Sequence, residues 1–354
     1  MNDSVQLFNK QLSVVTKPIP KISNPNDVLI KVSYSGVCGT DLHILSGEFP
    51  ASEKAVTLGH EFCGTVEAIG ESVCHVKVSD RVVANPNDNC HVCIFCSNGQ
   101  PHFCKSGGIR STTGIWKNGG WARYARVAGV LVHKVPQELQ MAKAVFTEPY
   151  SCIARGWTNL GEMKADAKVL VCGAGIIGLL WSALLHFKGY REFAVTEVSE
   201  GRQQLAANMN LGLKVVHPEH MMNLYREAKR TEDSEWGFDV IIDCTGAPAA
   251  IEQAFQWLRR GGKFLLFGCC PQESEIKLNP FEIYYKELKI IGSLINPYTF
   301  PKALSLVKDM SSYLDYDKLG VKTYQLQDYP EALDALKSGR ISKAVFQVDH
   351  EAED

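Results

Sequence analysis

The sequence contains no long hydrophobic run, no strong net charge, no internal repeat and no low-complexity segment. The longest apolar stretch, Ile176 to Phe187, contains Ser182 and His186 and is too short to span a bilayer. A formal net charge of -2 provides no global field that would attract nucleic acid or an anionic membrane. Met1 to Ser4 are polar, and no apolar signal core follows them. We therefore expect a cytoplasmic protein that binds neither nucleic acid nor membrane.

The composition is that of a globular protein with many cysteines. Hydrophobic residues make up 45% of the 354 positions and charged residues 21%, as in ordinary folded proteins. A chain of this length suits two domains better than one core. Twelve cysteines without an export signal indicate reduced thiols, which are either buried or bound to metal. Four of the twelve fall within fifteen residues, so these four are candidates for metal binding.

The first 140 or so residues are β-rich. Candidate strands are Val28–Ser33, Cys63–Ile69, Asp80–Ala84 and Tyr124–Val127. Clusters of Gly, Pro, Asn and Ser separate them. This pattern predicts a folded-over, barrel-like β domain.

The pattern changes near Glu148, after which candidate strands and helices alternate. The strands are Val169–Cys172, Phe193–Val198, Val240–Asp243, Lys263–Phe267 and Lys289–Gly292, and the helices are Ile176–Lys188, Arg202–Asn210 and Ala249–Leu258, with a Gly261-Gly262 turn. Such alternation predicts an α/β fold with a parallel, doubly wound sheet. A last helix, Pro301–Met310, and a last strand, Ala344–Val348, are expected to return to the first domain.

Residues 173–178 read Gly-Ala-Gly-Ile-Ile-Gly and match G-x-G-x-x-G between a strand and a helix. Gly173 permits a tight turn, Gly175 lets the backbone approach a pyrophosphate, and Gly178 lets the helix pack on the strand. The helix N-terminus, which includes Ile177, offers free N–H groups to the phosphates. The alternative interpretation is that residues 173–178 form an ordinary strand–helix turn without a binding function.

A carboxylate and an arginine follow the second strand of this unit. Glu197 lies 19 residues after Gly178, where a carboxylate accepts the ribose hydroxyls of NAD and repels a 2′-phosphate. We therefore predict NAD as cofactor, although Arg202 could bind the 2′-phosphate of NADP. In the alternative interpretation Glu197 is a surface glutamate.

The spacing of Cys90, Cys93, Cys96 and Cys104 is C-x2-C-x2-C-x7-C within residues 89–105. Four thiolates close a tetrahedral zinc shell, and such a site is structural. Iron–sulfur ligation is the alternative, but the ferredoxin run has a shorter last gap and a following proline, where this chain has Lys105. His91 and His102 are expected to be surface residues.

A second candidate ligand set combines Cys38, His60, Glu61 and Glu148. A thiolate and an imidazole suit zinc, and a carboxylate could be a third ligand or hold the metal-bound water. Three protein ligands and a water make an open, catalytic site. Taken alone, a cysteine and a histidine 22 positions apart are more often unrelated core residues.

Five segments of the chain, in their order and spacing, resemble the zinc-containing medium-chain dehydrogenases, in particular the polyol branch typified by sorbitol dehydrogenase. They are Gly36–His43, Gly59–Glu61, the four-cysteine loop, Glu148-Pro149 and Gly173–Gly178. The resemblance implies a GroES-like catalytic domain and a Rossmann domain. On this basis we expect domains at 1–147 and 148–293, with 294–354 returning to the first. It also implies a homodimer or homotetramer.

Carried over by position, Cys38, His60 and Glu148 take the catalytic zinc positions, and in the polyol branch the glutamate matching Glu61 can ligate directly. Thr40 and His43 match the family's proton relay. The resemblance thus implies two zinc ions per chain, one catalytic and one structural. The expected reaction is NAD-linked oxidation of a secondary alcohol, a small-molecule polyol or sugar alcohol, to the ketone.

Several positions depart from the family pattern. Trp121 replaces a phenylalanine and is expected in the core rather than in a substrate pocket, and Arg155 stands where many relatives have histidine. Ile295-Asn296 replace an Arg-Tyr pair of animal sorbitol dehydrogenases, which argues against sorbitol itself. Asn296 still offers a donor and an acceptor to a substrate hydroxyl. The remaining cysteines are expected to be buried: Cys63, Cys74, Cys152, Cys172, Cys244, Cys269 and Cys270.

Two other functions stay open at this point. The first is a threonine-type or 2,3-butanediol-type dehydrogenase. The second is a non-catalytic protein that binds NAD(H) as a sensor or scaffold. The non-catalytic function is disfavoured because the candidate ligands and relay residues are all intact: Cys38, His60, Glu148, Thr40 and His43.

Overall fold

The computed structural model describes residues 1–233 and 235–349. The chain forms two compact units. Of the described residues, unit 1 contains Met1–Ala154, Ile295–Leu314 and 321–349, and unit 2 contains 155–294 without residue 234, and Asp315–Gly320. Within the described part of the chain, no helix is long and apolar enough to cross a membrane.

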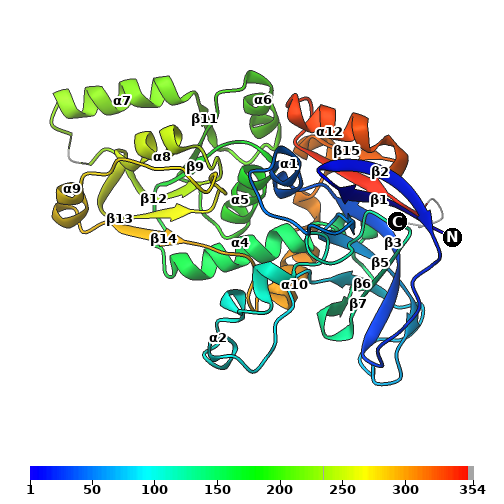
Figure 1. The fold of residues 1–354 in the computed structure, drawn as a ribbon. Coiled ribbons are helices and arrows are strands. Elements are labelled where there is room, and N and C mark those ends of the chain that lie inside the picture. The colour runs from blue at the N-terminus through cyan, green and yellow to red at the C-terminus, as the bar shows by residue number, and fades with distance from the viewer. Residues whose placement is uncertain (234, 350–354) are drawn as a thin grey trace. The chain divides into compact units, whose positions relative to one another are not determined.

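Unit 1 is built on two β-sheets (Figure 1). The larger follows the order β15-β16-β3-β5-β6-β8, with β7 also paired to β3, and the smaller follows β2-β1-β4. Their bounds are β1 Asn2–Phe8, β2 Gln11–Lys17, β3 Asp27–Gly36, β4 Val56–Thr57, β5 Glu61–Ile69, β6 Arg81–Ala84, β7 Tyr124–Ala128, β8 Val132–Lys134, β15 Val321–Tyr324 and β16 Lys343–Gln347. Strand β16 pairs antiparallel with the end of β3, so the C-terminal segment completes this sheet.

The helices of unit 1 are short except for α4, which continues into unit 2. They are α1 Gly39–Ser46, α2 Ile94–Ser97, α3 Met141–Ala144, α4 Thr147–Leu160, α10 Phe300–Asp309 and α12 Tyr329–Lys337, with 3-10 turns at Pro101–Phe103, Gly108–Ser111, Gly129–Leu131, Ser311–Tyr313 and Leu326–Asp328.

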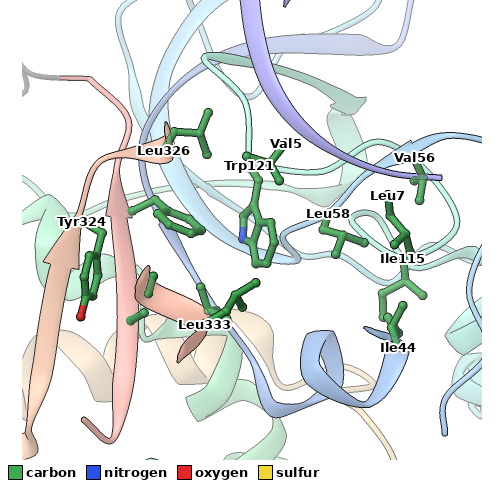
Figure 2. Close-up of a cluster of buried hydrophobic side chains, with 14 of the residues drawn as sticks. Val5, Leu7, Ile44, Val56, Leu58, Ile115, Trp121, Tyr324, Leu326 and Leu333 are labelled. Atoms are coloured by element: carbon green, nitrogen blue, oxygen red, sulfur yellow. The ribbon is translucent and has the colours of Figure 1, made fainter. Parts of the chain in front are cut away.

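Trp121 lies at the centre of an apolar cluster of unit 1 that also contains Leu58 and Phe346 (Figure 2). Its indole is completely buried and meets the Phe346 ring edge-on, with centroids 5.2 Å apart. The indole Nε1 donates to the Gly36 carbonyl oxygen at 3.1 Å, so the buried polar atom is satisfied. The prediction that Trp121 belongs to the core is confirmed.

Unit 2 is a six-stranded, wholly parallel sheet in the order β11-β10-β9-β12-β13-β14. The strands are β9 Val169–Cys172, β10 Phe193–Thr196, β11 Lys214–Val216, β12 Phe238–Asp243, β13 Leu258–Leu266 and β14 Lys289–Gly292, and the helices are α5 Ile176–Phe187, α6 Glu200–Asn208, α7 Pro218–Arg230, α8 Pro248–Phe255, α9 Pro280–Tyr285 and α11 Tyr316–Leu319. All four residues of β9 are buried, as expected for a central strand covered on both faces. The predicted fold class is confirmed.

Some local predictions differ from the structure. Gly261 and Gly262 lie inside β13, where the pairing with β12 shifts register, and Gly261 has a φ of 73°. The residues expected to form a turn therefore form an irregularity within a strand. Cys74 and Cys269 are exposed, because each lies in a loop, so the prediction that they are buried is wrong.

Candidate active site

The four-cysteine loop of unit 1 brings its thiols together. One ligand atom from each of Cys90, Cys93, Cys96 and Cys104 lies within 4.8 Å of all the others. The Sγ atoms of Cys93 and Cys96 are 3.6 Å apart, and those of Cys90 and Cys96 are 4.0 Å apart. A tetrahedral shell with Zn–S bonds of 2.3 Å requires a separation of about 3.8 Å. The four side chains therefore fit a zinc ion.

Backbone N–H groups point at these sulfur atoms. The N–H of Cys93 donates to Cys90 Sγ at 3.4 Å, and the N–H of Cys90 donates to Cys104 Sγ at 3.4 Å. Hydrogen bonds from the backbone of Val92 and Cys93 lower the pKa of Cys90 to about 6, which favours the thiolate that a metal requires. His91 is exposed as expected, but His102 is buried and its ring lies 4.0 Å from that of Phe103, so the surface prediction for His102 is wrong.

A second group of unit 1 contains Cys38, His60 and Glu61, whose ligand atoms also lie within 4.8 Å of one another. Cys38 follows β3 and caps α1, while Glu61 begins β5 and His60 precedes it. The antiparallel pairing of β3 and β5 sets Gly36 opposite Glu61. A Cβ at Gly36 would lie 2.1 Å from Glu61 Oε2, so only glycine leaves room for this carboxylate.

Two further buried residues contact the second group, and sequence reasoning missed both. Asp41 Oδ1 lies 3.6 Å from His60 Nδ1, and Asp41 Oδ2 accepts the Cys38 N–H at 2.8 Å. Burial raises the pKa of Asp41 to about 6, against the opposing effect of His60. A carboxylate behind the second nitrogen of a histidine commonly orients that histidine toward a metal. In the sequence, the signal that could have identified Asp41 is its position three residues after Cys38.

Lys343 is the other missed residue. Its Nζ donates to Glu61 Oε2 and, at 3.2 Å, to the carbonyl oxygen of Val37. Both side chains of the ion pair are almost fully buried. Burial lowers the pKa of Lys343, but the Glu61 carboxylate and the Cys38 thiol outweigh this and raise the pKa above its ordinary value. A lone lysine at the head of an apolar strand, β16, was the only hint in the sequence.

Glu148 and Cys152 lie one turn apart on α4. The Cys152 thiol donates to Glu148 Oε1 at 3.6 Å. Burial raises the pKa of Glu148 to about 7; the charge of His60 opposes this shift and that of Glu61 adds to it. The charges of His60 and Glu61 thus affect the pKa of Glu148, although Glu148 does not belong to the cluster of Cys38, His60 and Glu61.

Thr40 and His43, the residues that match the proton relay, both lie on α1. The Cys38 thiol donates to Thr40 Oγ1 at 3.6 Å, which places this hydroxyl at the second group. His43 is half-buried, and its Nδ1 lies 2.5 Å from Glu48 Oε2. One ring nitrogen of His43 therefore has a carboxylate partner, and the other nitrogen is available to exchange a proton with a second partner.

In unit 2 the glycine loop between β9 and α5 has the geometry of a phosphate cradle. Gly173 has a φ of 96°, and a Cβ at Gly178 would lie 1.9 Å from the Gly173 carbonyl oxygen. A Cβ at Gly175 would meet no atom within 4 Å, so open space faces this residue. Gly175 is also the N-cap of α5 and offers no side-chain cap, which leaves the first N–H groups, including that of Ile177, free for an anion.

Glu197 follows β10 and is buried beside this loop. Its Oε2 accepts the N–H of Ala174 at 2.8 Å, and its Oε1 accepts those of Val198 and Ser199 at 2.9 Å. A carboxylate has about four acceptor positions, so one is left for another donor. Arg202 lies in the first turn of α6, where its N–H points to Ser199 Oγ at 3.5 Å.

Asn296, expected to offer its amide to a substrate, is fully occupied by protein partners. Its Nδ2 donates to Ser151 Oγ at 2.7 Å and Asn85 Oδ1 at 3.2 Å, and its Oδ1 accepts from Asn87 Nδ2 at 2.8 Å. The side chain is 1% exposed. The expectation of a free substrate contact at Asn296 does not fit this network.

Comparisons with known proteins identify the family of the chain. The family model of the alcohol dehydrogenase GroES-like domain matches residues 24–137, and that of the zinc-binding dehydrogenases matches residues 177–309. D-arabinitol dehydrogenase 1 of Uromyces fabae is 31% identical over 94% of this chain and 93% of its own. The chain belongs to the zinc-containing medium-chain dehydrogenases. Within this family it falls in the polyol branch, as the sequence indicated, and it is an alcohol dehydrogenase.

Solved structures of the family share the fold. A 2R,3R-butanediol dehydrogenase from Bacillus subtilis superimposes with a TM-score of 0.86 at 30% identity, over 99% of this chain and 100% of its own. A zinc-binding dehydrogenase from Sinorhizobium meliloti, solved with NADP, has a TM-score of 0.86 at 29% identity over 98% and 99% of the two chains. As a family member, the chain uses zinc and a nicotinamide dinucleotide.

Proposed function

We propose that this dehydrogenase oxidises a polyol or sugar alcohol at a secondary hydroxyl, with NAD as the oxidant. The observation that carries the proposal is the convergence of Cys38, His60 and Glu61 on one point of unit 1. Similarity to a D-arabinitol dehydrogenase over nearly the whole chain supports a polyol substrate.

The metal ligands follow from the donor set. We assign Cys38, His60 and Glu61 to a catalytic zinc, with Glu148 as an alternative ligand or as the partner of a bound water. We assign Cys90, Cys93, Cys96 and Cys104 to a structural zinc. A catalytic zinc acts as a Lewis acid that lowers the pKa of a hydroxyl group.

The chain's own residues handle the proton. Thr40 Oγ1 lies beside Cys38 Sγ, so its hydroxyl is placed to accept the proton of an alcohol at this site. His43 is half-buried and paired with Glu48, so we assign it the next position, from which the proton reaches solvent. A bound nicotinamide would supply the hydride acceptor for the carbinol carbon, and the product would be a ketone.

The cofactor assignment rests on Gly173, Gly175, Ile177 and Gly178 for the pyrophosphate and on Glu197 for the adenosine ribose. The remaining acceptor position of Glu197 suits a ribose hydroxyl, and its charge opposes a 2′-phosphate. Arg202 would favour that phosphate, and one relative binds NADP. A comparison of kcat/KM with the two cofactors tests this choice: higher efficiency with NADP would overturn the assignment of NAD.

The proposed activity is tested by NADH formation with sorbitol, xylitol, ribitol, arabitols, galactitol, threonine and 2,3-butanediol. Turnover of a polyol, abolished by a zinc chelator, would support the proposal. Turnover of 2,3-butanediol alone would favour the second candidate, which similarity to the Bacillus subtilis enzyme supports. No turnover, together with a single zinc ion per chain, would favour a non-catalytic NAD(H)-binding protein.

We further propose that the protein is cytoplasmic, with domains at 1–147, 148–293 and 294–354.

We also propose that it forms a homodimer or homotetramer. Strand β14 supports self-association: it is at the edge of the six-stranded sheet, and its Ile290 is 43% exposed. An exposed apolar edge strand is readily paired by another chain. Size-exclusion chromatography with light scattering tests the oligomer, and a monomer would overturn it.

A further inference from the structure

A cavity of about 270 Å³ lies beside the four-cysteine loop, within unit 1. Its walls come from four segments of the chain: 85–91, 101–108, 130–133 and 295–301. None of Cys38, His60, Glu61 or Glu148 lines it, so it is distinct from the group assigned to catalysis. Its volume is near the lower limit of ligand pockets, about 300 Å³, and therefore suits a small molecule.

One side of the cavity is a fixed network of amides. The buried Asn296 binds Asn85, Asn87 and Ser151 through the three hydrogen bonds described above. Asn87 Oδ1 in turn accepts from Thr112 Oγ1 at 2.9 Å. Because each amide is held by its neighbours, the groups facing the cavity have fixed directions, which reduces the entropy cost of binding a ligand.

The His133 ring and the Asn85 amide nitrogen, both in the wall, have no partner among the described residues. The imidazole nitrogens of His133, on β8, form no hydrogen bond within residues 1–233 and 235–349, and the ring packs on Phe300 with centroids 5.1 Å apart. Asn85 uses its Oδ1 to accept from Asn296 and from the N–H of Asn87, while its Nδ2 donates to no described residue. These half-buried donors and acceptors are therefore available to water or to a ligand in the cavity.

The wall carries no positive side chain. Lysine and arginine are absent from the residues that line it, among those that the structure describes. The one carboxylate, Asp88, is paired with Lys117 at 3.1 Å. Burial, and then the charge of His75, lower the pKa of His133, so its imidazole is neutral near pH 7 and offers one donor and one acceptor. These features disfavour an anion and favour uncharged hydroxyl groups.

We propose that this cavity binds a small, neutral, polyhydroxylated molecule. Hydroxyl groups of the ligand pair with His133 and the Asn85 amide, while its C–H face lies on Leu131 and Phe300. The site is independent of whether the group around Cys38 oxidises a polyol.

The test measures ribitol binding by saturation-transfer NMR to the full-length protein carrying Cys38→Ser, so that turnover does not interfere. Val130 lines the cavity but is 63% exposed, so Val130→Trp can block it without disturbing the core. His133→Phe removes the imidazole nitrogens and keeps an aromatic ring against Phe300. We expect about tenfold weaker ribitol binding in each, as for the loss of one or two hydrogen bonds.

Val92→Trp is the matched control, because Val92 is 83% exposed in the same loop region and does not line the cavity. It should bind ribitol as the Cys38→Ser parent does. Equal ribitol affinity in all three variants would overturn the proposal. Inorganic phosphate is the second probe, and phosphate binding that is tighter than ribitol binding and is lost in Val130→Trp would overturn the neutral ligand class. Thermal unfolding of each variant establishes that it is folded.

Discussion

The two proposed metal-binding groups of unit 1 differ in how they are supported. The four cysteines lie within fifteen residues of the chain, in a loop where three of the thiols are half-buried and backbone N–H groups point at sulfur. The group of Cys38, His60 and Glu61 lies where β3 ends and the paired strand β5 begins, and Lys343, 282 positions from Glu61, neutralises its carboxylate. A local site depends on its own ligands, whereas a buried site depends on residues that never touch the metal.

The burial of the second group explains why it needs those partners. A carboxylate taken out of water is costly unless it is paired, and an imidazole must be held in one orientation to act as a ligand. Lys343 meets the first requirement and Asp41 the second. Substitutions that affect one group and not the other can test this difference.

The largest expected effect comes from Cys38→Ser. Loss of a metal that contributes several kcal/mol of charge stabilisation should reduce kcat/KM by about a thousandfold or more. Zinc content should fall by one ion while the four-cysteine ion stays. Cys74→Ser, which changes an exposed thiol, is the control and should leave both values unchanged. Activity retained in Cys38→Ser would contradict the assignment of this site.

Lys343→Met should have the next largest effect, on stability. In the zinc-free protein this leaves Glu61 buried without a counter-charge, and breaking a buried pair in this way costs about 3–5 kcal/mol. Denaturant unfolding measures the loss, and the double variant with Glu61→Gln should recover most of it.

The exposed pair of Lys322 and Glu331 supplies a control for that experiment. Lys322→Met should cost less than about 1 kcal/mol, as is usual for surface ion pairs. Equal losses in the free energy of unfolding for Lys322→Met and Lys343→Met would show that burial does not determine how much an ion pair contributes to stability.

Asp41→Asn should have an intermediate effect on the metal. Removal of the partner of a ligating histidine typically lowers metal affinity or activity 10- to 100-fold. Competition with a chelator should show one zinc ion that is released more easily and one that is unchanged. Equal weakening of both ions would indicate a general loss of structure instead.

Cys93→Ser should change turnover least. It removes one ligand of the structural site, so the loop at 89–105, which has few apolar contacts of its own, should become sensitive to proteases. The catalytic zinc should remain and turnover should stay close to that of the wild type. Complete loss of activity with the catalytic zinc still bound would contradict a purely structural role.

The regular elements could be predicted because their signals are local. β9 and β14 begin and end at the predicted residues, and α5 differs by one residue at its C-terminal end. The hairpin of β1 and β2 was missed because β2 is largely exposed and offers no apolar alternation. Helix α7 was also missed, although its buried Met221 and Ala228 stand seven positions apart, as on one face of an amphipathic helix.

The grouping of the candidate ligands was predictable, and the residues that support them were not. The four cysteines stand in a spacing that is recognisable by itself, whereas Cys38 and His60 were grouped through the resemblance to the family. The pair of Lys343 with Glu61 spans 282 positions, and no spacing within a sequence signals such a contact. The occupation of Asn296 by three protein side chains likewise depends on loops that meet only in three dimensions.

The position of Lys343 on the last strand has a consequence for biosynthesis. The four-cysteine loop is complete once Cys104 has been made, whereas the partner of Glu61 is made about 240 residues later. At roughly 5–20 residues per second, that interval is on the order of ten to fifty seconds. The nascent chain can therefore load its first zinc on the ribosome, while the buried Glu61 acquires its counter-charge, and the catalytic centre its final form, only after β16 has been made.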